Sequence, residues 1–421
     1  MNGTEDTEYR STGGVHHLGA LHLRVAAVLA GLFLIGLAAF VFAPGKGSDG
    51  AGWGIFTINL LFLMGVTQAG VAFAAIMRLA KAEWSKVFYR LAEATTLAFL
   101  PFAIAGFLAI YGFGREDLFY WLSSSAPHHP WLSAPLLLSR NLGALLVFYG
   151  VSTLYFLLAR LPDLHNQATE IDPYGNNWLC QKLRSFHIGR DPMRLQRYLY
   201  GLSPVVLIAF VVANTLIAWD FGMMIVPHWH STALPIFYWV ENLYAGMALL
   251  VILAALLSLK IQGGFVIDRS AIVPSLKSMG IMLTGFTLLW LYIFWSQFFV
   301  IWFGDLPHET QPLWQQMYGH YSLLFWIMMS CAFFIPFGTL IFARFKTSLR
   351  AMVSIALIIN AGIWLNKYLL VMPVLSTRHW PFTSLEEFAL TVGLLSGFLC
   401  ALLFIFRAFP IVAQREQDKI R

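Results

Sequence analysis

The stretch from Trp290 to Thr310, WLYIFWSQFFVIWFGDLPHET, combines residue types that suit proton chemistry at the edge of a membrane. Its first part is an aromatic-rich apolar run with a polar pair, Ser296 and Gln297, where polar groups are costly to bury. Its second part is a short turn that carries an imidazole and an acid, His308 and Glu309. A plain membrane anchor has no need of these groups. The stretch is therefore a candidate site where a polar or protonatable ligand meets the membrane.

Ionisable side chains within other apolar runs form the second group of candidates, because such residues are rare in membranes and usually functional. The acids are Glu93, Asp220 and Glu241, and we expect them to relay protons. The bases are Arg140 and Lys367, which we expect to hold a counter-charge. The alternative for each residue is structural, through hydrogen bonds between helices or snorkelling of a long side chain to the interface.

The composition requires a lipid environment for these groups. The chain has 421 residues, of which 58% are hydrophobic and 11% charged, whereas an average soluble domain has about 25% charged residues. Apolar runs of roughly 20 residues, long enough to cross a bilayer as a helix, recur along the chain. A β-barrel would show short alternating segments instead. The composition predicts an all-α polytopic membrane protein.

Ten membrane helices are expected from these runs. Their approximate ranges are 21–42, 54–79, 88–113, 135–160, 199–225, 236–260, 277–303, 321–344, 350–372 and 387–410. With this division, 22 of the 27 Lys and Arg residues fall on one side of the membrane and five on the other. Basic residues gather on the cytoplasmic side of membrane proteins, so both chain ends are predicted to be cytoplasmic.

The expected organisation has three parts: a cytoplasmic tail over 1–20, a ten-helix membrane domain over 21–411 and a cytoplasmic tail over 412–421. The first tail lacks the basic start and the cleavage site of a secretory signal, so the first apolar run is expected to remain in the membrane. The longest exposed segment, about 162–198, is interpreted as a solvated cytoplasmic loop or, alternatively, a docking surface.

Bound metals are not predicted for this chain. The three cysteines, Cys180, Cys331 and Cys400, are far apart and form no CxxC pair. Seven of the twelve histidines fall at the outer side, namely His128, His129, His228, His230, His308, His320 and His379. None of these lies in the middle of a predicted helix, which argues against haem ligation within the bundle. A surface site at His228 and His230 is a weak alternative. A Gly-rich phosphate loop is also missing, which argues against an ATP-driven transporter.

Two motifs resemble a known family. In the fifth predicted helix and its exit the matching residues are Asp220, Met223, Pro227, His228, Trp229, Ser231 and Thr232. In the seventh they are Trp290, Tyr292, Ser296, Gln297, Trp302, Pro307, Glu309 and Thr310. Together they resemble the NrfD/polysulfide-reductase membrane-subunit superfamily, and more narrowly the F subunit of bacterial alternative complex III, the quinone-binding subunit 2 of a quinol:cytochrome c oxidoreductase. One position departs from the family pattern, since His308 stands where an acid is expected.

The resemblance implies a fold of two four-helix bundles with two extra helices, in the bacterial cytoplasmic membrane. It implies oxidation of quinol, with menaquinone as one candidate, near the periplasmic face, and movement of protons by the membrane subunits. His228, Trp229, Gln297 and Trp302 become candidates for the quinone site, and Glu93, Asp220, Glu241, His308 and Glu309 for the proton relay. The implied partners are a paralogous NrfD-like C subunit, an iron–sulfur/molybdopterin-like B subunit, c-type haem subunits, small membrane subunits and lipids. Haem and iron–sulfur clusters would lie in these partners, because this chain has no CxxCH motif.

Three other functions fit parts of the sequence. The first is an NrfD-type subunit of another molybdopterin- or polysulfide-type oxidoreductase. The second is a proton-coupled secondary transporter, since ten helices with buried acids also suit a transporter. The third is a membrane scaffold without chemistry. Neighbouring genes for a molybdopterin subunit without c-type haem subunits would favour the first, and proton-coupled uptake by the isolated protein in vesicles would favour the second. Wild-type turnover after replacement of both Asp220 and Glu309 would support the third.

Overall fold

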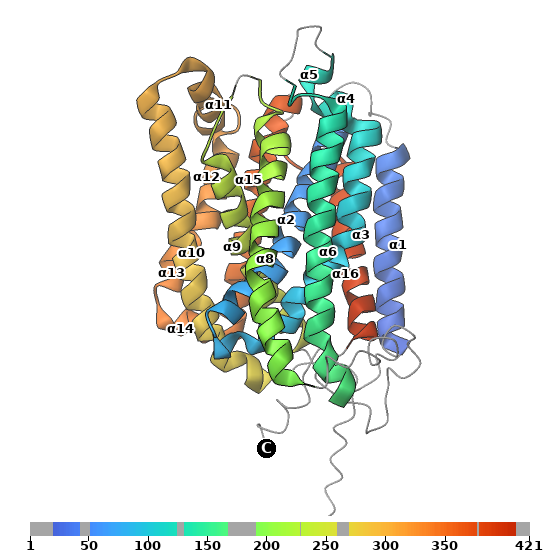
Figure 1. Ribbon diagram of the computed structural model, residues 1–421. Helices are drawn as coiled ribbons and strands as arrows, with labels where there is room; N and C mark the ends of the chain where they lie inside the picture. The colour runs from blue at the N-terminus through green and yellow to red at the C-terminus, as the bar shows by residue number, and fades with distance from the viewer. Residues whose placement is uncertain are drawn as a thin grey trace, which may run out of the picture.

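The computed structural model describes residues 20–42, 51–123, 130–166, 191–227, 229–258, 269–376 and 379–409. These residues form long helices that run side by side, and no strands (Figure 1). Ten of the helical segments are long and apolar enough to cross a membrane, which confirms the predicted fold class. The expected tails at 1–19 and 412–421, and most of the 162–198 loop, lie outside the described residues.

The spanning segments alternate in direction along the chain (Figure 1). In order they are α1 (Ala20–Phe42), α2 (Ala51–Leu79), α3 with its π-helical end η2 (Lys86–Ala109, Ile110–Gly114), α6 (Ala134–Asn166), α8 with η5 (Pro192–Ala218, Trp219–Met223), α9 (Leu234–Leu257), α10 (Arg269–Gly304), the interrupted helix α12–η6–α13 (Ser322–Met329, Ser330–Phe334, Ile335–Leu340), α15 (Leu349–Leu375) and α16 (Leu385–Ala408). Shorter elements are η1 (Glu83–Ser85), α4 (Arg115–Leu118), α5 (Tyr120–Ser123), α11 (Pro307–Met317) and α14 (Ala343–Lys346).

The helices pack as two four-helix groups and one pair, as the resemblance implied. The first bundle contains α2, α3, α6 and α8, and the second contains α9, α10, α12–α13 and α15. Helix α2 joins the bundles, because it also packs against α9 and α15. The remaining helices, α1 and α16, pack on each other, and α16 contacts α2 and α3. Helices α2 and α9 are consequently the most deeply buried of the ten.

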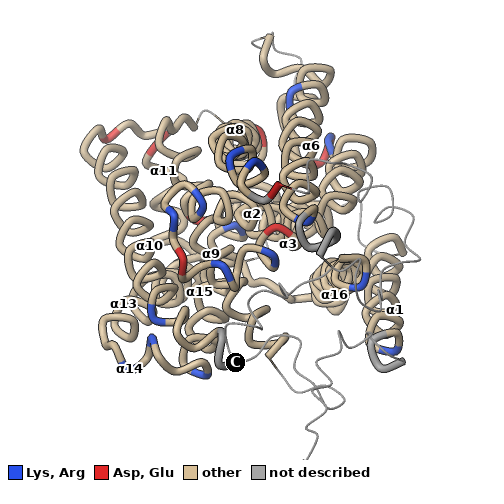
Figure 2. Tube along the Cα trace, turned by 60° about the horizontal axis from the view of Figure 1, so that its bottom comes forward, with Lys and Arg blue, Asp and Glu red and all other residues tan. Residues whose placement is uncertain are grey.

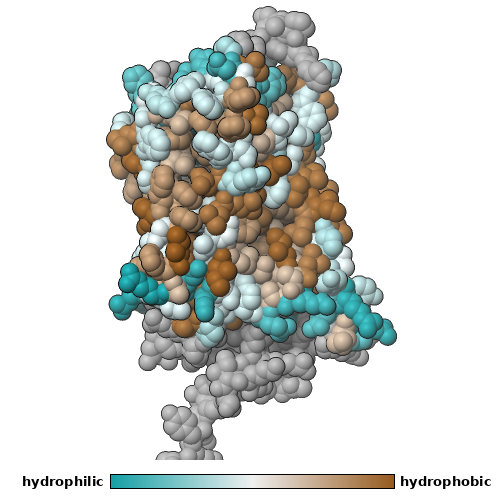
Figure 3. Space-filling model, turned by 90° about the vertical axis from the view of Figure 1, so that its left-hand side faces the viewer, coloured by the Kyte–Doolittle hydropathy of each residue, from teal (hydrophilic) through white to brown (hydrophobic). Residues whose placement is uncertain are grey.

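The two ends of the molecule differ in charge. Lys and Arg residues gather at the end that carries α14 (Figure 2). Helix α14 itself contains Arg344 and Lys346. We call this end the basic end, and the opposite end, with α4, α5 and α11, the far end (Figure 1). Between them, hydrophobic side chains cover the middle of the face seen in Figure 3, and hydrophilic residues lie above and below. Such a belt is what a bilayer requires. The cytoplasmic orientation of the basic end stays a prediction.

A sharp turn at the far end separates α10 from α11. Helix α10 ends at Gly304, and Asp305 adopts a positive φ of 43°, a conformation that short polar residues tolerate after a helix. Pro307 then begins α11, where its fixed φ and missing N–H are acceptable. The turn directs α11 across the end of the second bundle, so the residues after Trp290 reach the same region as the start of α9.

Close contact between the two bundles depends on glycine in α9. A Cβ atom at Gly246 would lie 2.5 Å from the Cβ of Ala69 and 2.9 Å from the carbonyl oxygen of Val66, both on α2. We therefore predict that Gly246→Val separates α2 from α9 and destabilises the protein by about 1–3 kcal/mol, as overpacking does. The matched control is Gly285→Val, because nothing lies within 4 Å of a Cβ at Gly285 on α10. Thermal unfolding in detergent is the measurement, and equal losses in the two variants would contradict the packing argument.

Candidate functional site

A cavity of about 410 Å³ lies within the second bundle, near the far end. It extends between α9, α10, α11 and α15, beside the segment that joins η5 to α9. Its walls are mainly apolar and aromatic, with amide side chains and one carboxyl group among them. The lining residues that matter below are Trp229, Phe237, Glu241, Phe294, Gln297, Gln311, Gln315, Gln316 and Asn366. We call this space the Glu241 cavity.

Two neighbouring residues of α15 hold the carboxylate of Glu241. Lys367 Nζ contacts Glu241 Oε1, and Asn366 Nδ2 donates a hydrogen bond of 2.6 Å to Oε2. Glu241 and Asn366 line the cavity, whereas Lys367 does not. The carboxylate thus lies between a cation behind the wall and the open space in front of it.

The environment of Lys367 explains why this charge is tolerated. The side chains of Lys367 and Glu241 are 0% and 1% exposed, so neither charge is solvated by water. The Lys367 ammonium also lies 3.2 Å from the ring centroid of Tyr238, which attracts a cation through its π-electrons. Removing one member of such a pair would leave an uncompensated buried charge. The pair therefore fixes α9 against α15.

The sequence-predicted quinone residues fall into three groups. Gln297 and Trp229 line the Glu241 cavity, and Phe294, one turn before Gln297, stacks on Trp290 with centroids 5.5 Å apart. Trp302 does not line it; its side chain is half exposed and packs on Phe299 at the outer face of α10. His228 lies outside the described residues. The seventh predicted helix therefore supplies one side of the cavity through Gln297, but not through Trp302.

Helix α11 covers the cavity from the far end. Gln311, Gln315 and Gln316 contribute amides to its lining, and Gln316 Nε2 donates to the carbonyl oxygen of Leu369 on α15 at 2.9 Å. Glu309 is half-buried in the first turn of α11 and lines neither this cavity nor the open depression beside Pro307 and Trp314. His308 belongs to the same turn, and its side chain is outside the described residues.

Asp220 and Arg140 form a separate ion pair in the first bundle. Arg140 Nε and Nη2 donate to the two carboxylate oxygens of Asp220 at 2.7 and 2.6 Å, and Asn141 Nδ2 donates to the same carboxylate. The third guanidinium nitrogen donates to the Trp131 carbonyl oxygen at 2.6 Å. Asp220 lies in the π-helical turn η5. Neither Asp220 nor Arg140 lines the Glu241 cavity, and both oxygens of Asp220 already have partners. This ion pair is therefore separate from the cavity.

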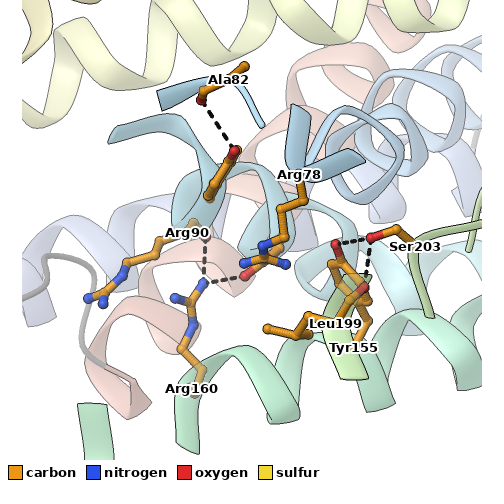
Figure 4. A network of polar contacts seen from close by, with 9 residues as sticks. Arg78, Ala82, Arg90, Tyr155, Arg160, Leu199 and Ser203 are labelled. Atoms are coloured by element: carbon orange, nitrogen blue, oxygen red, sulfur yellow. Dashed lines mark hydrogen bonds and ion pairs between the residues drawn. The ribbon is translucent and has the colours of Figure 1, made fainter. Parts of the chain in front are cut away.

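Glu93 is held by two arginines, Arg78 and Arg160, which Figure 4 shows close to each other. Arg78 on α2 lies 2.7 Å from Oε1, and Arg160 on α6 donates to Oε2 at 2.9 Å. The guanidinium of Arg78 also lies between the rings of Tyr89 and Tyr155, about 5 Å from each centroid. Three helices of the first bundle therefore meet at one buried carboxylate.

A chain of buried amides connects the two bundles between these acids. Asn242 on α9 donates to Asn214 Oδ1 on α8 at 2.8 Å, and Asn214 donates to Gln68 Oε1 on α2 at 2.9 Å. All three side chains are buried. One turn of helix separates Glu93 from Thr96, whose hydroxyl donates to the carbonyl oxygen of Thr67, the neighbour of Gln68, at 2.6 Å. Polar groups thus extend from the neighbour of Glu241 to the vicinity of Glu93.

Several residues of these sites escaped sequence reasoning. Asn366 was not singled out, although it is an amide beside the recognised Lys367. The glutamines of α11 were not singled out either, because they follow the apolar run of the seventh predicted helix and lie outside the predicted spans. Arg78 and Arg160 were counted only as charges that set membrane orientation. The sequence did offer a signal for both arginines, because each lies within or next to an apolar run. In the fold both contact the same buried acid, Glu93.

Comparison with known proteins identifies the family. The family model described as "Polysulphide reductase, NrfD" matches residues 46–378, which include both bundles, the Glu241 cavity and all three acid sites. No curated protein matches the chain. Because the match covers well over half of the sequence, this chain belongs to the NrfD family, the membrane subunits of quinone-interacting oxidoreductase complexes.

Proposed function

We propose that this chain is the membrane subunit of a quinol-oxidising complex of the alternative complex III type, and that the Glu241 cavity binds the quinol headgroup. The observation that carries the proposal is the position of one ion-paired carboxylate in the wall of an otherwise apolar and aromatic space. A quinol needs an apolar slot for its ring and a base for its hydroxyl proton. The cavity has both.

The size and lining of the cavity fit this ligand. Its volume of about 410 Å³ lies in the range of small-molecule sites, roughly 300–1,000 Å³. Phe237, Phe294 and Trp229 offer ring faces for stacking. Gln297 and Asn366 offer amide groups that hydrogen-bond to the oxygens of either redox form, since an amide is both donor and acceptor.

Each residue of the carboxylate site has a distinct task in this proposal. Glu241 accepts a hydroxyl proton of the bound quinol, and Lys367 supplies the positive charge that partners the carboxylate in the cavity wall. Asn366 fixes Oε2 of Glu241, the oxygen that Lys367 does not contact. Complete oxidation of a quinol releases two protons and two electrons. The electrons pass to iron–sulfur and c-type haem centres in partner subunits, because this chain contains no CxxCH motif and no cysteine cluster.

The buried amide chain supports a second part of the proposal, a proton route into the first bundle. Asn242, Asn214 and Gln68 are hydrogen-bonded in series, and buried polar chains of this kind order water molecules between titratable groups. Glu93, with its two arginines, is the acid at the basic end of this route. The pair of Asp220 and Arg140 offers a third protonatable group toward the far end.

An NrfD-type subunit of another oxidoreductase is the second candidate function, because the family match favours a quinone-linked redox complex as such. In such a complex the same cavity would bind the quinone, and the redox partner would be a molybdopterin-type subunit. Purification in mild detergent separates the candidates. Copurification of c-type haem subunits and a paralogous NrfD-like subunit supports our proposal, and a molybdopterin subunit without c-type haem contradicts it.

One prediction of the proposed function concerns the carboxylate in the cavity wall. Glu241→Gln removes the proton acceptor and preserves the shape of the side chain. We expect the quinol oxidation rate of the purified complex to fall about 100-fold, the lower end of what a general base contributes. The control is Glu386→Gln, because Glu386 is a half-buried acid of α16 that does not line the cavity.

The measurement is steady-state quinol oxidation together with quinone binding followed by tryptophan fluorescence. Because Glu241→Gln also leaves the buried Lys367 without its ion-pair partner, thermal unfolding of the variant is measured first. The folded fraction is expected to bind quinone within a few-fold of the wild type, because the apolar walls of the slot remain. A Glu241→Gln variant that turns over at the wild-type rate would exclude Glu241 as the base, and a Glu386→Gln variant that loses activity to the same extent would show a general effect of acid removal.

Another prediction of the proposed function concerns the chain of buried amides. Asn214→Leu interrupts the bridge from Asn242 to Gln68, because both hydrogen bonds of Asn214 to these residues are lost. We expect proton uptake or release by the complex in sealed vesicles to fall several-fold while quinol oxidation in detergent is kept. The control is Asn360→Leu on α15, whose amide donates only to the carbonyl oxygen of Ala356 on its own helix. Unchanged proton movement in Asn214→Leu would rule out this route.

A further inference from the structure

Four cations lie together at the basic end of the second bundle. They are Lys277 on α10, Arg344 and Lys346 on the short helix α14, and Arg350 in the first turn of α15. Helix α14 packs against both α10 and α15, so residues from three segments are brought to one place. We call this group the α14 basic patch. Figure 2 shows Lys and Arg residues gathered near the labels of α13 and α14.

No acid among the described residues neutralises the patch. The ion pairs of the described chain involve other cations, and none includes Lys277, Arg344, Lys346 or Arg350. The element η1 also packs against α10, and its acid, Glu83, is already paired with Lys86. The patch therefore presents four positive charges to an external partner.

Packing holds the side chains of the patch in place. The aliphatic stem of Lys346 lies against Gly280 of α10, where a Cβ atom would approach it to 2.8 Å. Lys277 precedes Gly280 by three residues on that helix, so the two lysines are neighbours across the α10–α14 contact. The guanidinium of Arg344 lies 4.8 Å from the ring centroid of Phe345 and 5.7 Å from that of Phe342.

The surroundings of the patch place it at a membrane surface. Ile341 and Phe342 follow the candidate span that ends at Leu340 and are 52% and 53% exposed. Exposed apolar side chains next to a membrane span form a surface that suits lipid. Arg344 and Arg350 next to them are also exposed. A partner must therefore offer a negative group at the level of the headgroups and hydrocarbon beside it.

We propose that the α14 basic patch binds the headgroup of an anionic phospholipid. The phosphate would meet Lys346, Lys277 and the two arginines, which are suited to phosphate oxygens, and the acyl chains would cover Ile341 and Phe342. Membrane orientation alone requires positive charge at this end of the protein. It does not require four cations, unpaired among the described residues, on three packed segments, and this difference makes the proposal testable.

The test compares two variants of the full chain that lose the same charge at the same end. In the patch variant Lys277, Arg344, Lys346 and Arg350 are each replaced by Gln. In the control variant the same change is made at Arg24, Lys81, Arg197 and Arg407, which are exposed on other helices or turns of this end. Both variants lose the same positive charge at the same end, so any effect on membrane orientation should be the same in the two. Accessibility labelling in membranes checks the orientation.

Binding of phosphatidylglycerol and cardiolipin to each purified protein is measured by native mass spectrometry, with phosphatidylcholine as the neutral reference. Each cation near an anionic lipid surface contributes roughly fivefold to binding, so the patch variant should bind these lipids at least about tenfold more weakly. The control variant should bind them as the wild type does, and phosphatidylcholine binding should be equal in all three proteins.

Equal anionic-lipid binding by the patch variant and the wild type would overturn the proposal, and so would an equal loss in the control variant. If the fourfold patch variant does not fold, the single variants Lys277→Gln and Arg350→Gln take its place. Each is expected to weaken binding several-fold and to reduce its dependence on salt. Wild-type binding in both single variants would equally refute the site.

Discussion

The buried ion pair of Glu241 and Lys367 is the interaction on which the second bundle and its cavity depend. Both side chains are essentially without solvent exposure, so each charge is tolerated only because the other is present. Loss of one partner of a buried pair typically costs about 3–5 kcal/mol. The pair joins α9 to α15 and fixes the wall of the cavity. It also places a carboxylate beside an apolar space, where proton transfer has a chemical use.

The three buried acids of the chain have different surroundings, and these suit different tasks. Glu241 adjoins a cavity and has one cation behind it. Asp220 has both oxygens occupied by Arg140 and Asn141, which resembles a structural clamp at a π-helical turn. Glu93 is shared by two arginines near the basic end. In our proposal, ligand chemistry therefore belongs to Glu241, and proton relay or helix fixation to Asp220 and Glu93.

Hydropathy was sufficient to predict the helices, because a spanning helix must be apolar over its whole length and ten such runs are present. Charge in a membrane is conspicuous, so Glu93, Glu241 and Lys367 were recognised individually. Their partners were not, since Glu241 and Lys367 are 126 positions apart and no pattern in a single sequence encodes a contact between separate helices. The opposite limit applies to the aromatic residues, which the sequence motif names without showing which way each one faces.

A family motif cannot distinguish a residue that faces a ligand from one that faces lipid. Trp302 illustrates this, because it belongs to the same motif as Gln297 but lies at the outer face of α10. Asn366 illustrates the opposite error, since an amide near the end of a helix resembles many interfacial residues. Its role depends on the 2.6 Å contact with Glu241, which only the packing of α9 on α15 creates.

Photoaffinity labelling with an azidoquinone tests the central claim most directly, because it locates the ligand without relying on activity. The account predicts that label on the wild-type protein is found in peptides of α9, α10, α11 and α15 that line the Glu241 cavity, and that unlabelled quinol competes with it. Label confined to α1, α6 or α16, or labelling that excess quinol does not reduce, would contradict the assignment of this cavity to quinol.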